Sequence, residues 1–304
     1  MKRRQSLIVI GLAVAAILLS SSAYALNLRF NVMFGAKHPL CKEGFVPWAE
    51  EVEKVTDGRV KVTMFYSSAL FKPKQAYDSI KSRAGDVGII VAAYQRNRRL
   101  MANVMDLPMV AGKKAEVNSE VLQTLYDSTP EMQKELRDVK ILWAYMNPAF
   151  QLHFTKKKVH SLNDLKDVVI SAGGPTQSSI VQALGGAVEA MPMVDVYLAM
   201  QKGVIDGCFL PYAPLRTQKI ADLLTHHTDA NLMAVSFFIG INKKVWAKIS
   251  PEDQKAIEAI SGMAASKKFG AIFDKYQERD VKWMAEKGDT FYTLTAEQQK
   301  EWAG

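Results

Sequence analysis

The sequence lacks the short motifs that usually accompany catalysis or cofactor binding. It contains no His-Glu-x-x-His, no Gly-x-Ser-x-Gly, no phosphate-binding Gly-x-x-x-x-Gly-Lys and no Gly-x-Gly-x-x-Gly. Its five histidines include one adjacent pair, His226 and His227, and neighbouring side chains on a strand or helix point in different directions. We therefore expect no catalytic residues, no metal site and no cofactor, which favours a binding protein over an enzyme.

Cysteine is also scarce, because Cys41 and Cys208 are the only two in the chain. An exported protein could join them in one disulfide, but the sequence does not show whether they come within bonding distance. Two buried free thiols are the alternative that we favour.

Positive charge is present but dispersed. The formal net charge is +8, and the basic residues form no more than short clusters such as Arg98-Arg99 and Lys156-Lys157-Lys158. No aromatic or groove-reading motif accompanies them. We therefore expect no nucleic-acid partner.

Long apolar runs are absent except at the start of the chain. Basic residues at 2–4, an apolar run over 7–19 and the small-residue pattern Ala23-Tyr24-Ala25 are typical of an export signal. The run is shorter than the roughly 20 residues that a membrane-spanning helix needs. We predict that residues 1–25 are a cleaved signal peptide and that the mature protein is periplasmic.

The mature part alternates predicted strands with predicted helices. Residues 26–34 and 60–65 have strand patterns, with a helix about Phe45, Trp48 and Val52 between them. The segments RAGDVGII and KGVIDGCF repeat one pattern: a helix end, a turn with aspartate and glycine, and an apolar strand. Each helix end needs a residue that tolerates left-handed geometry, and an apolar strand indicates a sheet covered on both faces. The fold class is therefore α/β, with two similar lobes that each hold a mixed, mainly parallel sheet flanked by helices.

A very long helix is predicted near the C-terminus. Ser250 is a suitable N-cap with proline directly after it, and helical spacing continues to Gly288. About 36 residues would span roughly 50 Å, which is wider than one such lobe. We expect this helix to brace both lobes, and we expect a further helix to start at Thr295 by capping-box logic.

Several segments together resemble the DctP-type solute-binding proteins of tripartite ATP-independent periplasmic (TRAP) transporters. These segments are FVPWAEEVEKVTDGRVKVTMFYSSAL, VMDLPMV, SLNDLKDVVISAGGP, MPMVDVYLAMQKGVIDGCFLP and FFIGINKKVWAKISPEDQKAI. The resemblance implies a type II-like periplasmic binding protein, monomeric, that encloses a small organic solute and delivers it to the small and large membrane permease proteins. It divides the chain into lobe I (26–150, with a return segment at about 230–249), lobe II (151–229) and a bracing C-terminal segment (250–304). Members of this family usually continue beyond the point at which this chain stops, which suggests a truncated C-terminus.

The candidate ligand-binding residues follow from where loops leave the carboxyl ends of strands. They are His38, Phe71, Lys72, Tyr94, Asn147, Phe150, Gln151, Ser171, Gly173, Asp195, Tyr212 and Arg216. For the aromatic residues among them, core packing is the competing interpretation.

Ser171 is a departure from the family pattern. The resemblance places at this position an arginine that grips a ligand carboxylate, and serine offers neither its charge nor its two parallel hydrogen bonds. Either the ligand is not a simple carboxylate, being neutral, zwitterionic or aromatic, or another cation such as Lys72, Arg98 or Arg216 replaces the arginine. We favour the first alternative. A periplasmic sensor subunit for a histidine kinase and an enzyme on a two-lobe scaffold are the competing functions.

Overall fold

The computed structural model describes residues 25–95 and 98–303. The predicted signal peptide lies outside these residues except for its last position. Within the described residues, none of the helices combines the length and the apolar character needed to cross a bilayer.

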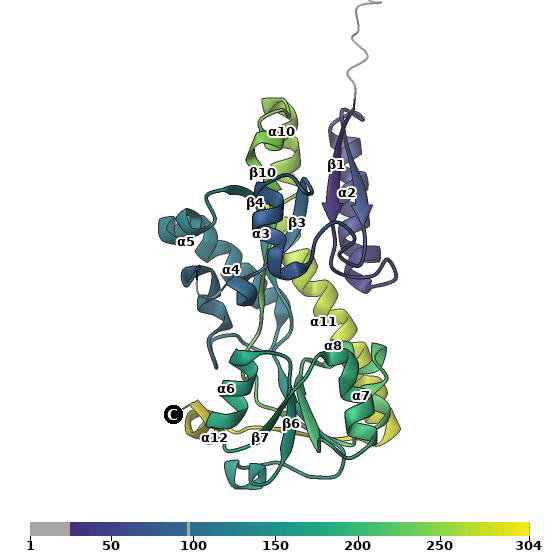
Figure 1. Ribbon diagram of the computed structural model, residues 1–304, viewed down its shortest axis with the longest axis vertical. Helices are drawn as coiled ribbons and strands as arrows, with labels where there is room; N and C mark the ends of the chain where they lie inside the picture. Colours follow the sequence, from purple (N-terminus) through teal and green to yellow (C-terminus); the bar gives the residue numbers. More distant parts are fainter. Residues whose placement is uncertain (1–24, 96–97, 304) are drawn as a thin grey trace, which may run out of the picture.

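Lobe I is built on a five-stranded sheet in the order β2-β1-β3-β10-β4 (Figure 1). Strands β2, β1 and β3 run parallel, and β10 pairs antiparallel with both β3 and β4. The strands are β1 (Leu26–Asn31), β2 (Val60–Phe65), β3 (Val87–Val91), β4 (Val139–Met146) and β10 (Ser236–Asn242). The helices of this lobe are α2 (Val46–Val55), α3 (Ala76–Lys81), α4 (Ala115–Ser128), α5 (Pro130–Glu135), α9 (Lys243–Trp246) and α10 (Pro251–Ala259).

Lobe II is built on a six-stranded sheet in the order β11-β9-β5-β8-β6-β7. Its strands are β5 (Gln151–Phe154), β6 (Val169–Ala172), β7 (Ala187–Ala190), β8 (Gly207–Leu210), β9 (His226–Asp229) and β11 (Thr290–Thr293). Its helices are α6 (Pro175–Ala183), α7 (Met193–Gln201), α8 (Tyr212–Thr217) and α12 (Ala296–Ala303). The C-terminal segment thus supplies an edge strand to lobe II, since β11 pairs with β9. Two mixed α/β sheets confirm the predicted fold class.

The repeated sequence pattern places an equivalent aspartate in each lobe. Asp86 precedes β3 and accepts a hydrogen bond from the backbone N–H of Arg29 on the adjacent β1, at 3.0 Å. Asp206 precedes β8 and accepts one from the N–H of Val169 on the adjacent β6, at 2.9 Å. The left-handed residue before each strand is Arg83 (φ +66°) in lobe I and Gly203 (φ +70°) in lobe II. The two segments therefore have the same structural role, which their similar sequences indicate: each leads from a left-handed residue to an aspartate that accepts a hydrogen bond from the neighbouring strand.

The long C-terminal helix is present, but the prediction of one unbroken helix from Ser250 was wrong. Helix α10 ends at Ala259 and α11 runs from Gly262 to Lys287, and its first residue, Gly262, is in a left-handed conformation (φ +51°). Helical spacing of the apolar residues continues through this break, so the periodicity did not reveal it. The Ser250 cap is confirmed, because its Oγ accepts a hydrogen bond from the Asp253 N–H at 3.1 Å.

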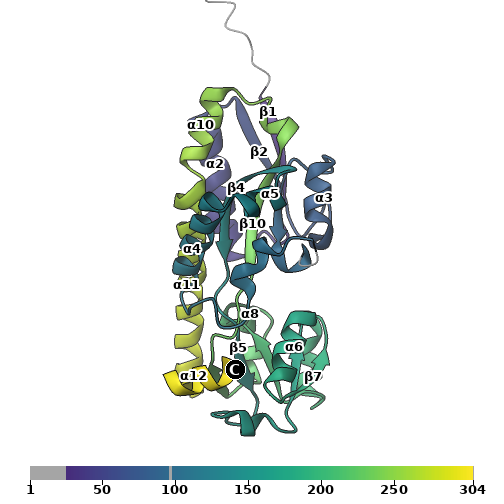
Figure 2. The same ribbon diagram turned by 90° about the vertical axis from the view of Figure 1, so that its left-hand side faces the viewer.

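Helix α11 packs against α4 and β4 of lobe I and against α8 of lobe II, and Figure 2 shows it running along both lobes. The contact with α4 is close. Asp274 accepts hydrogen bonds from the N–H groups of Ala115 and Glu116 at 2.9 and 3.0 Å, which caps the start of α4 from another helix.

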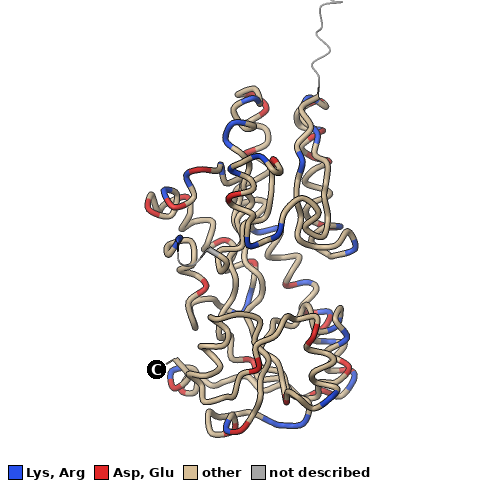
Figure 3. The backbone as a smooth tube through the Cα atoms, viewed as in Figure 1, with Lys and Arg blue, Asp and Glu red and all other residues tan. Residues whose placement is uncertain are grey.

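Both thiols are free and buried, so the alternative of two free cysteines is confirmed. Along the part of the chain that the structure describes, lysines, arginines and carboxylates are scattered over both lobes (Figure 3).

Candidate functional site

A cavity of about 500 Å³ lies where the two lobes and α11 meet. Lobe I contributes the loop after β1 and the end of β3, and lobe II contributes the turn after β6 and the segment after β8. Both crossing segments, near Asn147 and near Met233, also line it. Helix α11 closes one side with Ile272, Phe273 and Tyr276. The cavity therefore lies at the carboxyl ends of strands, where α/β folds usually bind ligands.

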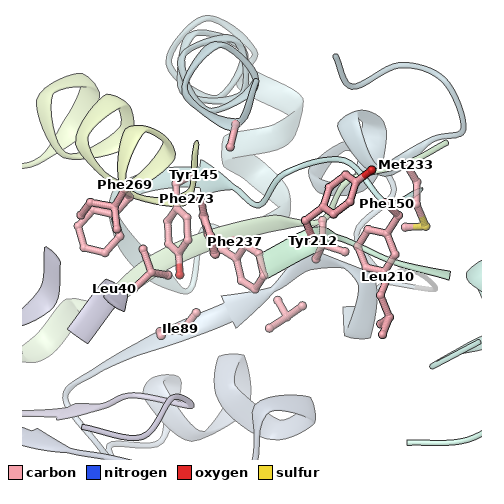
Figure 4. Close-up of a cluster of buried hydrophobic side chains, with 14 of the residues drawn as sticks. Leu40, Ile89, Tyr145, Phe150, Leu210, Tyr212, Met233, Phe237, Phe269 and Phe273 are labelled. Carbon is pink, nitrogen blue, oxygen red and sulfur yellow. The ribbon is translucent and has the colours of Figure 1, made fainter. Parts of the chain in front are cut away.

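Most of the cavity wall is apolar and aromatic. Figure 4 shows Phe150, Leu210 and Met233 at one end of a cluster of buried side chains and Phe269 and Phe273 of α11 toward the other, with Phe237 between them. Phe237 is held by a stacked ring, since its centroid lies 5.0 Å from that of Tyr145 with an interplanar angle of 13°. Such a wall suits a flat apolar ligand.

His38 is a polar group in this wall that burial keeps uncharged. Its Nδ1 accepts a hydrogen bond from the Leu40 N–H at 3.2 Å, and its ring stacks on Phe34 at 4.2 Å. Burial lowers the pKa of His38 to about 4. A neutral ring whose Nδ1 accepts carries its proton on Nε2, so His38 is available as a hydrogen-bond donor.

Asn147 is the second polar candidate in the wall. Its Oδ1 accepts a hydrogen bond from the Val235 N–H at 2.7 Å, which ties the two crossing segments together. Among the described residues its amide NH₂ group makes no hydrogen bond, so this group remains available to a ligand.

The charged side chains that line the cavity come from α11. Arg279 and Asp280 both line it, and Asp280 is buried with 1% of its side chain exposed. Asp280 Oδ1 accepts hydrogen bonds from Arg279 Nε at 2.8 Å and from Arg216 Nη1 at 3.2 Å.

The structure brings five of the twelve sequence-predicted residues to the cavity. These five are His38, Tyr94, Asn147, Phe150 and Gly173. The other seven lie elsewhere. Phe71 belongs to the core of lobe I, where its ring lies 2.8 Å from the position that a Cβ would take on Gly85 or on Gly88. Lys72 is exposed in the turn after it.

Two further candidates are buried beside the cavity. Gln151 braces the crossing segments, because its Nε2 donates to Asn231 Oδ1 at 2.7 Å and its Oε1 accepts from the Asn231 N–H at 2.8 Å. Ser171 lies in β6 between β7 and β8, with 2% of its surface exposed, and among the described residues its Oγ has no hydrogen-bond partner.

The remaining three also have structural surroundings. Asp195 is exposed in the first turn of α7. Tyr212 is buried and donates a hydrogen bond to Asp229 Oδ1 at 2.6 Å. Arg216 lies behind the cavity wall, where its guanidinium carbon is 4.9 Å from the centre of the Trp283 ring.

Sequence reasoning did not nominate several residues that line the cavity. The most consequential are Phe237, Phe273, Tyr276 and Arg279. Ile272, Phe273, Tyr276, Arg279 and Asp280 recur at helical spacing on one face of α11. That spacing indicates that these residues share one face of α11, but from the sequence we interpret this helix only as a brace between the lobes.

Taken together, the two lobes, the crossing segments and the cavity between the lobes define a two-lobed binding protein. The family model for bacterial extracellular solute-binding protein family 7, DctP, matches residues 30–304. This chain belongs to that family, whose members are the solute-binding proteins of TRAP transporters.

Individual relatives agree with this assignment. The chain is 29% identical to the outer membrane transporter protein TsaT of Comamonas testosteroni over 90% of this chain and 80% of that protein. A TRAP periplasmic solute-binding protein from Desulfovibrio salexigens superposes with a TM-score of 0.84 at 25% identity, covering 91% and 85% of the two chains. A marine metagenome TRAP solute-binding protein specific for aromatic acid ligands, in complex with 3-hydroxybenzoate, superposes with a TM-score of 0.81 at 25% identity, covering 92% and 88%.

Proposed function

We propose that this protein captures a small aromatic acid in the cavity between its lobes. The observation that carries the proposal is the wall itself, which combines Phe34, Phe150, Phe237 and Phe273 with the rings of Tyr94 and Tyr276. Burial of a benzene ring among them removes apolar surface from water, and aromatic pairs add further stabilisation when offset or edge-to-face. The 3-hydroxybenzoate complex of the metagenome protein supports the same ligand class.

The protein then acts as the periplasmic receptor of a TRAP transporter, not as an enzyme, and passes its ligand to the membrane subunits. The predicted export signal and the membership of the family support this role. Capture is expected to draw the lobes together about the crossing segments. Mass spectrometry of periplasmic protein should find a mature chain that begins near Leu26, and uptake of the ligand by cells should require both this protein and its permease.

Calorimetry and thermal unfolding with a panel of acids test the ligand class. 3-Hydroxybenzoate and mandelate should bind and raise the unfolding temperature, whereas succinate and D-glucuronate should not. A ligand at 100 times its dissociation constant adds about 2.7 kcal/mol to the stability, which is readily measured.

Helix α7 offers a matched pair of variants for this test. Met193 lines the cavity, whereas the next residue, Val194, is 70% exposed. Met193→Trp should fill the cavity and abolish binding, and Val194→Trp should leave binding unchanged. Tight binding of a sugar acid or an aliphatic dicarboxylate, with no aromatic acid bound, would refute the proposal.

A further inference from the structure

The cavity carries a fixed charge that comes from three residues on two helices. Arg279 and Asp280 lie on α11, and Arg216 on α8 reaches Asp280 from behind the wall. We call these three residues the charge triad. Two guanidinium groups and one carboxylate give the triad a net charge of +1. His38 does not add to it at neutral pH, because its buried ring is uncharged.

Asp280 is the fixed member of the triad. Only 1% of its side chain is exposed, and a buried carboxylate is very costly unless it is paired and hydrogen-bonded. Its Oδ1 receives Arg279 Nη2 at 2.7 Å and Arg279 Nε at 2.8 Å, together with Arg216 Nη1 at 3.2 Å. Oδ1 of Asp280 therefore contacts both arginines and holds them in place.

Arg279 is the exposed member of the triad that lines the cavity. Its side chain is 49% exposed, and its guanidinium carbon lies 4.4 Å from the centre of the Tyr276 ring. Tyr276 is itself held, since its hydroxyl donates a hydrogen bond to Glu43. A guanidinium has five N–H donors, and Asp280 is the acceptor for those that Arg279 uses among the described residues. Arg279 is thus oriented on two sides and retains donors, including both on Nη1, for another anion.

The cations that the sequence nominated as substitutes do not offer this arrangement. Lys72 is exposed away from the cavity, and Arg98 pairs with Asp78 on the surface. Arg216 belongs to the triad, but it does not line the cavity. Position 171 carries a serine that is buried in β6.

We propose that Arg279 anchors the carboxylate of the ligand and that the +1 charge of the triad selects a monoanion over a dianion. This inference rests on the proposed function, because it assumes that an aromatic acid occupies the cavity. One carboxylate on the free edge of Arg279 neutralises the triad. A second carboxylate would enter the apolar wall without a counter-ion.

The first experiment compares meta-substituted benzene ligands of similar shape that carry no charge, one negative charge or two. Calorimetry on the native protein should show that 3-hydroxybenzoate binds more tightly than 3-hydroxybenzamide, which is neutral, and than isophthalate, which carries two carboxylates. Charge-assisted hydrogen bonds contribute enough for Arg279→Gln to weaken 3-hydroxybenzoate binding about 10- to 150-fold, while the affinity for the benzamide changes little. Arg279→Lys should recover part of the loss, because it restores the charge but not the planar fork.

The second experiment changes the charge of the triad by a substitution at Asp280 and keeps the Arg279 side chain, whose contacts an amide oxygen at position 280 can still accept. Asp280→Asn keeps the shape of the side chain and raises the net charge to +2. It should shift the ratio of isophthalate to 3-hydroxybenzoate affinity at least tenfold toward isophthalate. The unfolding temperature of each variant shows whether it is folded. The comparison of the three ligands on the native protein does not depend on any variant. It therefore measures the charge preference even if a variant fails to fold.

The outcomes separate this inference from the proposed function. If the native protein binds no aromatic acid, the proposed function fails. If it binds aromatic acids but does not distinguish 3-hydroxybenzoate from its amide, or if a folded Arg279→Gln variant keeps that preference, the inference about Arg279 is refuted and the proposed function stands.

Discussion

Gly270 allows α11 to approach α4 at a distance that no larger residue permits. A Cβ at this position would lie 2.5 Å from Glu116 Cα, 2.6 Å from Ala115 O and 2.7 Å from Glu116 N. These are backbone atoms at the start of α4, so they cannot turn aside as a flexible side chain could. Gly270→Ala must therefore push the two helices apart.

Two effects of opposite sign decide the result. Alanine in place of glycine within a helix is favourable by about 1 kcal/mol. Overpacking of a well-packed contact costs typically about 1–3 kcal/mol. Separating the helices also lengthens the hydrogen bonds from the Ala115 and Glu116 N–H groups to Asp274. The two magnitudes leave a net loss of about 1 kcal/mol, and at most about 2 kcal/mol, in the free energy of unfolding, to which the weakened hydrogen bonds to Asp274 add.

Urea unfolding followed by tryptophan fluorescence measures this loss as a lower midpoint. The reverse substitution at Ala264, which is exposed on the same helix, calibrates the helix propensity: Ala264→Gly should cost about 1 kcal/mol. If Gly270→Ala instead stabilises the protein by a similar amount, helix propensity dominates, and α11 and α4 do not approach each other as closely as described.

Three further predictions concern other buried groups. Burial lowers the pKa of His38 to about 4, so as the pH falls the unfolded chain binds a proton at this residue before the folded protein does. The free energy of unfolding should therefore fall by at most about 3 kcal/mol as the pH drops from about 6.5 to about 4. His38→Gln should reduce this pH dependence, as measured by urea titrations at each pH. Burial raises the pKa of Cys41 to about 11 and that of Cys208 further, so a thiol reagent at pH 8 should label neither in the folded protein and both after denaturation; rapid labelling of the native protein would contradict this. Asp206→Ala should destabilise lobe II by about 1–3 kcal/mol through the lost acceptor for the Val169 N–H, and Asp206→Asn, which keeps an acceptor oxygen, should recover most of the loss in thermal unfolding.

The elements of the fold could be predicted where local chemistry sets them. The Ser250 cap, the capping box at Thr295 and the aspartate before each buried strand depend on residues close together in the chain, and each is found in the structure. The break between α10 and α11 was missed because the apolar spacing continues through it, although Gly262, which is left-handed there (φ +51°), is a local signal. A contact between distant residues also lies at this point, since Trp48 Nε1 donates a hydrogen bond to Ser261 Oγ at 3.2 Å.

The candidate site was only partly predictable for a related reason. Residues on loops after strands, such as His38 and Asn147, could be nominated because the topology places strand ends together. Phe71 also follows a strand, yet it turns into the core to cover two glycines. Arg279 lies within a helix, and only the rotation of α11 about its axis brings this side chain to the cavity. The helical spacing identifies the face of α11 that carries Arg279, but whether that face meets a cavity or the core depends on packing against both lobes.

The position of β10 has a consequence for the order in which the chain acquires its structure. Strand β10 pairs with β3 on one side and β4 on the other, although nearly all of lobe II lies between β4 and β10 in the chain. Among the described strands, β4 has β10 as its only partner. The sheet of the N-terminal lobe thus cannot be completed before residue 242 is available, however early its first strands emerge. Until then β4 has no strand to pair with among the described strands, so late completion of this sheet is a consequence of the topology that suits a family of extracellular proteins.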